Sequence, residues 1–388
     1  MSDADVVVVG GGVAGVAIAR ELAPHREVHL LEWEAIATGG ATALAAGEVT
    51  MTPSYSDVPA VADHAMEFFH EYDGTRQFAF HDRPSVELVP ADREAEARRR
   101  ADRLADAGFA VAFQEPETVG EALPRLRLEE FAGVVRHEDT GFLDPYTFAV
   151  TLQADAEERG ATVETGRTVT DVLVEDGAVT GVATDDGPLA AQTVIVAAGW
   201  RTRDLVADHL RLPTRTYRTQ VVVLDPDPPM AGDFPMGWIP GEHVYFRPER
   251  NGDFLVGGWS FAEDDPVGVS TSEDEAFRDH VAGLVPRFLA EMDRAGFVDG
   301  WAGIDAATPD TRPVVDAPTD APDGLVVATG FHGRGVMTAP VTGTVVRELV
   351  LGESPSVPHD PFALDRFDSG SAEFPFFSIS SGDEEYEA

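Results

Sequence analysis

The chain has 388 residues, a net charge of −41, and neither cysteine nor lysine, so arginine is its only strong base. Without cysteine there can be no disulfide, thiolate metal site or cysteine nucleophile, and the sequence predicts no metal site. The acidic residues are spread along the whole chain, which argues against nucleic acid as a ligand and favours a surface adapted to molar salt, as in a halophile, over a local acidic binding patch.

A strand, a glycine-rich turn and a helix are predicted at the start of the chain. The four β-branched residues 6–9 predict a buried parallel strand that runs directly into residues 10–15. This stretch, GGGVAG, fits G-x-G-x-x-G. The first glycine permits a tight turn, the second lets backbone approach a pyrophosphate, and the third lets the helix expected over residues 16–23 pack on the strand. The helix N-terminus would offer free N–H groups to the phosphates.

An acidic residue follows at the spacing of a nucleotide-binding unit. A second apolar strand over residues 28–31 ends at Glu32, about 20 residues after the glycines, where a carboxylate can bind both ribose hydroxyls of an adenosine. The small and flexible stretch over residues 38–47 comes next and could wrap a cofactor. Strand, glycines, helix, strand and acid in this order predict a dinucleotide-binding site, but they do not distinguish FAD from NAD.

The periodicity of apolar residues predicts a mixture of helices and strands in the rest of the chain. Helices are expected over residues 59–72, 91–107, 146–159, 272–295 and 338–351. Strands are expected over residues 160–164, 168–173, 178–184, 193–197, 220–224, 244–248, 254–258 and 325–330, with antiparallel β structure between about 215 and 260. No apolar run approaches the ~20 residues of a membrane span and no apolar leader begins the sequence, so we expect a soluble, cytoplasmic protein.

Several motifs in this order resemble the FAD-dependent D-amino-acid oxidase family, which includes sarcosine oxidase, glycine oxidase and amino-acid dehydrogenases. The resemblance covers the chain up to Arg366 and begins with the glycine motif and Glu32. Its other motifs are GFLDP (141–145), VAAGW (196–200), YFRP (245–248), TPDTRP (308–313) and ATGFHGRG (328–335). The last two motifs, near the C-terminus, are the most specific.

The resemblance implies an α/β fold, with a Rossmann-like FAD-binding domain and an interleaved α+β substrate domain built on an antiparallel sheet. The FAD-binding domain would be discontinuous and take residues 1–50, 141–205 and 301–366. The substrate domain would take the two insertions, residues 51–140 and 206–300. Residues 367–388, which are acidic and rich in serine and glycine, are predicted to form a flexible tail.

The resemblance also implies a set of FAD-binding residues, carried over by position. They are Gly10, Gly12, Val13, Ala14, Gly15, Glu32, Thr42, Val169, Ala197, Gly199, Gly330, Gly333, Arg334, Gly335, Val336 and Met337. Residues 333–337 would lie beside the isoalloxazine, where a helix beginning near Thr338 aims its positive end at the pyrimidine edge of the reduced flavin. The FAD is expected to be non-covalent, because a cysteine link is impossible; a histidine link is left open.

The implied reaction is the oxidation of an amine or amino acid of the glycine, sarcosine or D-amino-acid type. The α C–H bond gives a hydride to the flavin, the resulting imine is hydrolysed by water, and O2 or another acceptor takes the electrons. The candidate catalytic residues are His332, Arg334, Tyr245 and Arg247. His332 could contact the substrate or pack under the flavin.

The usual lysines of sarcosine-type oxidases are missing, which favours a dehydrogenase. An arginine or histidine could replace the charge of a lysine, so an oxidase remains open. Met337 stands where the lysine that binds the substrate carboxylate would be, and Asp305 stands near the place of an arginine in glycine-oxidase-like members. The remaining candidates to hold a carboxylate are Arg247, Arg312 and Arg334, with Tyr245 as a hydrogen-bond donor.

Three other hypotheses remain open. An FAD-dependent 2-hydroxy-acid or glycerol-phosphate dehydrogenase would need a base, and His332 is the candidate. An NAD-dependent dehydrogenase is disfavoured, because the late strand–glycine–helix unit that completes the cofactor site is characteristic of flavoproteins. The chain could also be a flavin-binding subunit of a larger dehydrogenase complex, with its acidic tail as a docking segment for a partner subunit.

Overall fold

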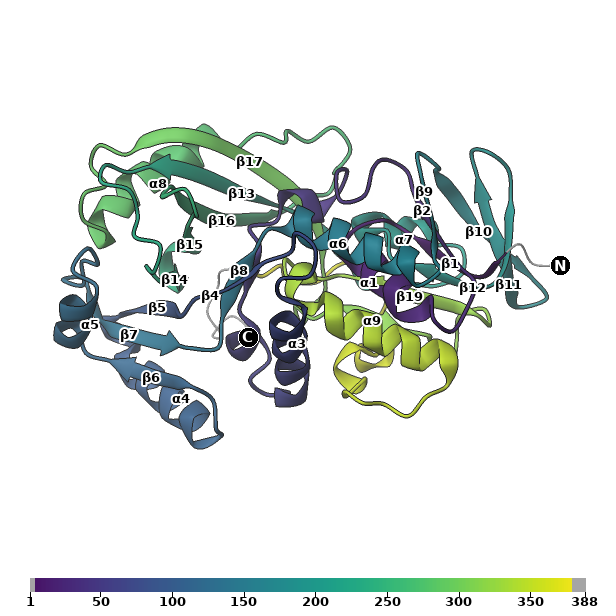
Figure 1. Cartoon of the computed structure of the whole chain (residues 1–388), viewed down its shortest axis with the longest axis horizontal. Coiled ribbons are helices and arrows are strands. Elements are labelled where there is room, and N and C mark those ends of the chain that lie inside the picture. Colours follow the sequence, from purple (N-terminus) through teal and green to yellow (C-terminus); the bar gives the residue numbers. More distant parts are fainter. Residues whose placement is uncertain (1–3, 379–388) are drawn as a thin grey trace.

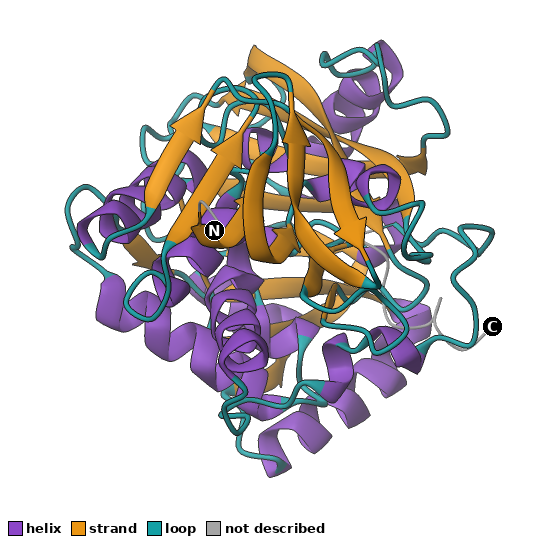
Figure 2. Ribbon diagram, turned by 90° about the vertical axis from the view of Figure 1, so that its right-hand side faces the viewer, coloured by secondary structure: helices purple, strands orange, loops and turns teal. Residues whose placement is uncertain are grey.

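Two large β-sheets lie next to each other along the long axis of the molecule (Figure 1). The computed structural model describes residues 4–378. The first sheet is at the right of Figure 1 and the second at the left, while helices gather on one side of the first sheet (Figure 2). The two sheets and the helices that cover them confirm the predicted α/β fold.

The first sheet has a parallel centre in the order β9-β2-β1-β12-β19. Strand β1 pairs with β2 on one side and with β12 on the other. The order of the strands along the chain therefore reverses direction beside β1. In doubly wound sheets, ligands bind at the carboxyl ends of the strands at such a reversal. The strands are β1 (Ala4–Val9), β2 (Val28–Glu32), β9 (Thr162–Thr165), β10 (Val169–Glu175), β11 (Ala178–Thr184), β12 (Leu189–Val196), β18 (Val314–Asp316) and β19 (Leu325–Thr329).

Burial on both faces explains the unbroken apolar run of β1. Val6 and Val8 pack into a core shared with the helices α1 (Val13–Leu22), α6 (Pro145–Glu158) and α9 (Gly335–Leu351). Val7 and Val9 pack into a second core with the β10–β11 hairpin on the other face. Alternate side chains of a strand point to opposite faces, so a strand covered on both sides is apolar throughout.

The second sheet has the order β17-β13-β16-β15-β14-β5-β7-β6. Its pairs are antiparallel as predicted, except that β5 and β14 run parallel. These two strands come from the two different insertions, so no hairpin fixes their relative direction. The strands are β5 (Ser85–Pro90), β6 (Val111–Gln114), β7 (Phe131–His137), β13 (Arg215–Asp225), β14 (Met236–Ile239), β15 (Val244–Pro248), β16 (Phe254–Ala262) and β17 (Gly296–Ala307).

A small third sheet, β3-β8-β4, joins the two parts. Its strands are β3 (Glu48–Val49), β4 (Phe80–Asp82) and β8 (Gly141–Leu143). The remaining helices are α2 (Met51–Ser54), α3 (Pro59–Tyr72), α4 (Glu94–Asp106), α5 (Pro116–Ala122), α7 (Thr202–Leu205) and α8 (Glu275–Phe288). Among the residues described, no helix combines the length and apolar character needed to cross a membrane.

Several element boundaries differ from those expected, among them the starts of α1 and β12. Helix α8 covers residues 275–288 rather than 272–295, and α9 begins at Gly335, three residues before Thr338. Strand β17 crosses the predicted domain boundary between residues 300 and 301, because it pairs with β13 along its length. Residues 301–307, assigned from the sequence to the FAD-binding domain, therefore lie in the second sheet.

Part of the predicted flexible tail lies against the folded body. The Phe376 ring packs on Tyr217 and His332, with centroids 5.2 and 5.5 Å apart, and the Phe377 carbonyl is 2.8 Å from His332 Nε2. Residues 379–388, which belong to the same prediction, lie outside the described residues.

Gly15 is expected to be essential for packing α1 on β1. A Cβ there would lie 1.8 Å from the Gly10 carbonyl oxygen, so Gly15→Ala should lower the free energy of unfolding by about 2 kcal/mol or more through overpacking. Denaturant unfolding in molar salt measures this change. Gly283→Ala in α8, where the Cβ meets nothing within 4 Å, is the control and should leave stability equal or slightly higher. Equal stability of the two variants would contradict the close approach.

Candidate cofactor and substrate site

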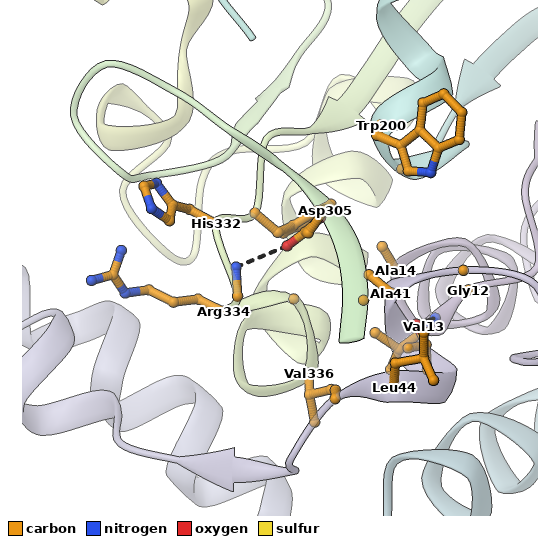
Figure 3. A pocket seen from close by; sticks show the side chains of 18 of the residues that line it. Gly12, Val13, Ala14, Ala41, Leu44, Trp200, Asp305, His332, Arg334 and Val336 are labelled. Carbon is orange, nitrogen blue, oxygen red and sulfur yellow. Dashed lines mark hydrogen bonds between the residues drawn. The ribbon is translucent and has the colours of Figure 1, made fainter. Parts of the chain in front are cut away.

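A cavity of about 620 Å³ runs from the glycine motif to the second sheet. Its nucleotide end is lined by residues of the first sheet and its loops, among them Gly12, Glu32, Thr42, Val169 and Gly199. Its sheet end is lined by Glu48 of β3 and by residues of the second sheet, among them Glu87, His137, Tyr217, Tyr245 and Asp305. The start of α9 also lines the cavity, and Figure 3 shows Val336 there.

Most of the predicted FAD-binding residues come together in this cavity. Those that line it are Gly10, Gly12, Val13, Ala14, Glu32, Thr42, Val169, Ala197, Gly199, Gly333, Arg334, Gly335, Val336 and Met337. Gly15 and Gly330 do not. Gly15 packs against Gly10, and a Cβ on Gly330, whose φ is +72°, would lie 2.5 Å from Thr308 Cγ2. Both of these glycines shape the backbone behind the cavity.

The glycine motif exposes the N-terminus of α1 to the cavity. The first N–H groups of a helix have no intrahelical acceptor. One of them, that of Val13, donates to Thr42 Oγ1 at 3.1 Å, which ties the loop over residues 38–47 to the helix. A Cβ on Gly12 would lie 3.2 Å from the same oxygen, so any side chain would crowd the place where a pyrophosphate is expected. The positive end of the helix dipole favours an anion there.

Glu32 is held at the end of β2 by backbone donors. Its Oε2 accepts the Gly11 N–H at 2.5 Å and its Oε1 accepts the Glu34 N–H at 3.0 Å, and the residue is 7% exposed. The carboxylate is therefore fixed against the glycine motif, in the position expected for binding ribose hydroxyls. Nearby, the Arg201 guanidinium lies over the rings of Trp33 and Trp200, 4.1 and 4.3 Å from their centroids. The sequence analysis missed this stacked cation, because its partners are far apart in the chain.

The second helix N-terminus at the cavity belongs to α9. The helix begins at Gly335, so the N–H groups of Gly335, Val336 and Met337 fall in its first turn, where no intrahelical acceptor exists. The N–H of Gly333 is not available, because it donates to Asp305 Oδ2 at 2.8 Å, as the dashed line in Figure 3 shows. Thr50 Oγ1 contacts the Met337 sulfur at 3.8 Å.

His332 lies on the cavity wall but is buried and neutral. It is 1% exposed, its Nε2 bonds to the Phe377 carbonyl at 2.8 Å, and its Nδ1 has no hydrogen-bond partner. Burial, together with the nearby Arg334 charge, lowers the pKa of His332 to about 3. A ring with this pKa is a weak proton acceptor, so the geometry favours packing over general-base catalysis.

The two arginines predicted to be catalytic are both engaged by the protein. Arg334 lines the cavity, but its side chain extends away from the glycine motif and its Nη1 donates to the Thr311 carbonyl at 2.7 Å (Figure 3). Arg247 does not line the cavity. Its Nε donates to the Ala46 carbonyl at 2.8 Å and its Nη2 pairs with Glu249 at 2.9 Å. Arg247 therefore supports the loop before Glu48 from behind.

The sheet end contains residues that sequence reasoning missed or could not place. Tyr245 lines it as predicted, with its ring over Gly257, where a Cβ would lie 2.1 Å from the tyrosine Cζ. Tyr217 of β13 was not predicted, because it lies in the polar first half of the strand, before the apolar run over residues 221–224. Its hydroxyl is 3.4 Å from Asp305 Oδ2, and burial raises the pKa of both groups. Glu48 was also missed, because it stands among small residues with no motif around it.

The residues present fit an FAD molecule. Two helix N-termini, a fixed carboxylate and a glycine-lined approach meet in one cavity that continues past the second helix to a separate sheet. Figure 3 shows Gly12, Val13 and Ala14 on one side of the view and His332 and Arg334 on the other, with Asp305 between them. Fold and site together define a dinucleotide-binding oxidoreductase of the flavoprotein class.

The family match agrees with this assignment. A family model described as FAD dependent oxidoreductase matches residues 5–349, which is most of the chain. The chain therefore belongs to this family of FAD-dependent oxidoreductases, and the predicted cofactor is confirmed.

Among curated relatives, the hydrogen cyanide synthase subunit HcnC of Pseudomonas aeruginosa is 28% identical over 63% of this chain. That match spans 59% of the HcnC sequence, so the chain spans less than two thirds of this relative. Glycine oxidase of Geobacillus kaustophilus is 27% identical over 93% of this chain and 97% of its own length. The solved structure of L-proline dehydrogenase from P. horikoshii has a TM-score of 0.84 at 23% identity, covering 94% of this chain and 98% of that chain.

Glu32 is expected to contribute to FAD affinity through its charge. Glu32→Gln keeps the shape but weakens acceptance of the ribose hydroxyls, so the dissociation constant for FAD should rise about tenfold. Recovery of free-flavin fluorescence on dilution in molar salt measures it. Glu34→Gln, which removes an exposed charge two residues away, is the matched control and should bind FAD like the unmodified chain. Equal affinity in both variants would rule out this role.

The tail contact predicts a change in the titration of His332. Removing residues 376–388 takes away the ring that covers His332 and the carbonyl that it bonds. Burial lowers the pKa of His332 by more than the hydrogen bond to Phe377 raises it. Loss of both should therefore raise the pKa from about 3 toward the usual value of about 6.5, so that the ring gains its proton at higher pH than before. Histidine NMR shifts followed against pH measure this, with exposed His70 as the internal control. A His332 ring that still does not titrate above about pH 5 would contradict the covering role of the tail.

Proposed function

We propose that this chain is an FAD-dependent enzyme that oxidises an amine or amino acid at the carbon next to nitrogen. The observation that carries the proposal is the single cavity that joins two helix N-termini to the second sheet. Glycine oxidase and D-amino acid dehydrogenase, named among its relatives, support this reaction class. Bound FAD would supply a two-electron acceptor for the hydride of the α C–H bond.

One end of the cavity would bind FAD and the other end would bind the substrate. Residues 1–50, 141–205 and 301–366 would mainly hold FAD, with Glu32 on the ribose and Val169 near the adenine. The first N–H groups of α9 would face the pyrimidine edge of the flavin, where negative charge develops on reduction. Residues 51–140 and 206–300 would mainly bind the substrate, with Tyr245 as a hydrogen-bond donor. FAD would be held without a covalent bond.

No general-base residue is required if the amine reaches the flavin with its lone pair free. The lack of lysine favours a dehydrogenase that passes electrons to an acceptor other than O2. HcnC is by its printed name a subunit of hydrogen cyanide synthase, so a partner subunit for this chain is part of the proposal to be tested. A cytoplasmic location and adaptation to molar salt are also proposals, which rest on composition and charge.

Oxidation of a 2-hydroxy acid or of glycerol phosphate is less well supported. These substrates need a group that removes the hydroxyl proton, and His332 is buried, with a pKa of about 3. This alternative would therefore need a different base. Turnover that survives His332→Ala would exclude His332 as that base.

Mixing the flavin-loaded protein with substrate classes tests the proposal directly. Under anaerobic conditions in molar salt, amines or amino acids should bleach the flavin absorbance, and 2-hydroxy acids and glycerol phosphate should not. The rate at which colour returns in air then separates an oxidase from a dehydrogenase. Bleaching by a hydroxy acid alone would contradict the proposed reaction, and a purified protein unable to bind FAD would contradict the whole assignment.

A further inference from the structure

Three acidic side chains line the sheet end of the cavity, at separate places along it. The carboxylates of Glu48, Glu87 and Asp305 all line it. The chain has 69 acidic residues. Among the described residues, only four acidic side chains belong to residues that are less than 9% exposed. Two of these four, Glu87 and Asp305, belong to the sheet end. A general adaptation to salt explains exposed acids, but it does not explain acids inside a cavity.

Glu48 is the carboxylate that lacks a partner. It belongs to the two-residue strand β3, whose other member, Val49, is fully buried in the core, so alternation places Glu48 on the opposite face. Its Oε1 is buried and has no hydrogen-bond partner. Burial raises the pKa of Glu48 to about 8, and the nearby Arg247 charge only partly opposes this effect. Glu48 as a residue is only partly buried, but a carboxyl oxygen that is buried without a partner is unfavourable in its ionised form unless a ligand supplies a donor or a positive charge.

The cations near the sheet end are already engaged by protein groups. Arg100 pairs with Glu87, and Arg334 donates to the Thr311 carbonyl. Arg247 uses its Nε on the Ala46 carbonyl, its Nη2 on Glu249 and its Nη1 on the Pro248 carbonyl, at 2.8, 2.9 and 3.4 Å. A substrate carboxylate beside Glu48 would meet a group of the same charge, while the guanidinium groups of Arg100 and Arg247 are held by other protein groups.

Asp305 adds charge but is not itself an open ligand. Its Oδ2 accepts the Gly333 N–H and its Oδ1 accepts the Ala306 N–H, each at 2.8 Å, and the Tyr217 hydroxyl is 3.4 Å from Oδ2. It is fixed by these donors beside the start of α9 (Figure 3). Its field favours a cation in the cavity, while Glu48 has an oxygen left to bind one.

We propose that the substrate is a cationic amine with no carboxylate next to its nitrogen, and that Glu48 binds its ammonium group. This inference rests on the proposed oxidation of an amine in the same cavity and narrows the substrate class. Primary and secondary alkylamines fit this description, and so do diamines, whereas α-amino acids do not.

The same contact would prepare the amine for oxidation. The ionised Glu48 takes one proton from the ammonium group, which gives a carboxylic acid and a neutral amine with a free lone pair. Loss of hydride from the α carbon then converts the C–N bond to an iminium. The amine is oxidised by two electrons, and the bound flavin is the oxidant that is reduced. Water hydrolyses the iminium outside this step.

Binding of two probes of opposite charge tests the charge preference without turnover. The tert-butylammonium ion and pivalate share the tert-butyl group, and neither carries the α C–H bond that oxidation needs. With the flavin-loaded full chain in molar salt at about pH 9, tert-butylammonium should perturb the flavin spectrum at concentrations at least tenfold below those at which pivalate acts. Equal binding, or preference for pivalate, would overturn the inference.

Substitutions then assign the preference to Glu48. Glu48→Gln should raise the dissociation constant for tert-butylammonium about tenfold or more, while Glu48→Asp should keep part of the affinity. Glu71→Gln, which removes an exposed charge on α3, is the control and should bind like the unmodified chain. Retained flavin in each variant reports that it is folded. Unchanged affinity in Glu48→Gln would overturn the role of Glu48.

Anaerobic reduction by a matched substrate pair separates this inference from the proposed function. Butylamine and D-norvaline share the alkyl chain and differ by the carboxylate. Faster reduction by butylamine supports both proposals. Reduction by D-norvaline alone would overturn the cationic-amine inference and leave amino-acid oxidation standing. Reduction by neither, with a hydroxy acid active, would overturn the proposed function and the inference with it.

Discussion

The structure depends on bringing unpaired backbone N–H groups against a negatively charged cofactor. The N-termini of two helices, α1 and α9, lie at the same cavity, although 322 positions separate Val13 from Gly335 in the chain. For α1 this requires Gly15 to pack against the Gly10 carbonyl and Gly12 to leave room beside Thr42. These glycines have no chemistry of their own. They remove side chains beside a helix end, whose partial positive charge favours an anionic group.

Charge divides the cavity into two different environments. At the nucleotide end, helix N-termini and the stacked Arg201 suit an anionic cofactor, and Glu32 is satisfied by backbone donors. At the sheet end, arginines are engaged by carbonyls and carboxylates, and Glu48 has an oxygen without a partner. We expect binding at the sheet end to follow electrostatic complementarity. A ligand of opposite charge is favoured there, because a ligand of the same charge would be repelled and left unpaired. A protein with an extremely acidic surface can therefore still show a specific charge preference inside.

The sequence predicted the nucleotide half well because its signals are local. The strand, glycines, helix and Glu32 lie within 30 residues, and strand β11 has the bounds that the sequence predicted. The late ATGFHGRG stretch contributes residues 331–335 to the lining of the cavity. The helix after it begins earlier than expected, at Gly335, because glycine is tolerated in the first turn, where propensity alone disfavours it.

The substrate half could not be predicted in the same way. One of the two partners of β5 is β14, about 150 residues away, and no local pattern indicates that pairing or its parallel direction. Arg247 has the sequence character of a substrate anchor, and only the fold shows that its guanidinium holds Ala46 and Glu249. The burial of Glu48 depends on contacts from β8 and β15, so its unusual environment is invisible in a stretch of small residues.

A crystal structure of the flavin-loaded protein with tert-butylammonium would test the central claim most directly. The pyrimidine edge of the flavin should meet the first N–H groups of α9, and the ammonium nitrogen should lie within hydrogen-bond distance of a Glu48 carboxylate oxygen. A flavin bound in the reverse direction, or an ammonium ion held away from Glu48 at the sheet end, would contradict it.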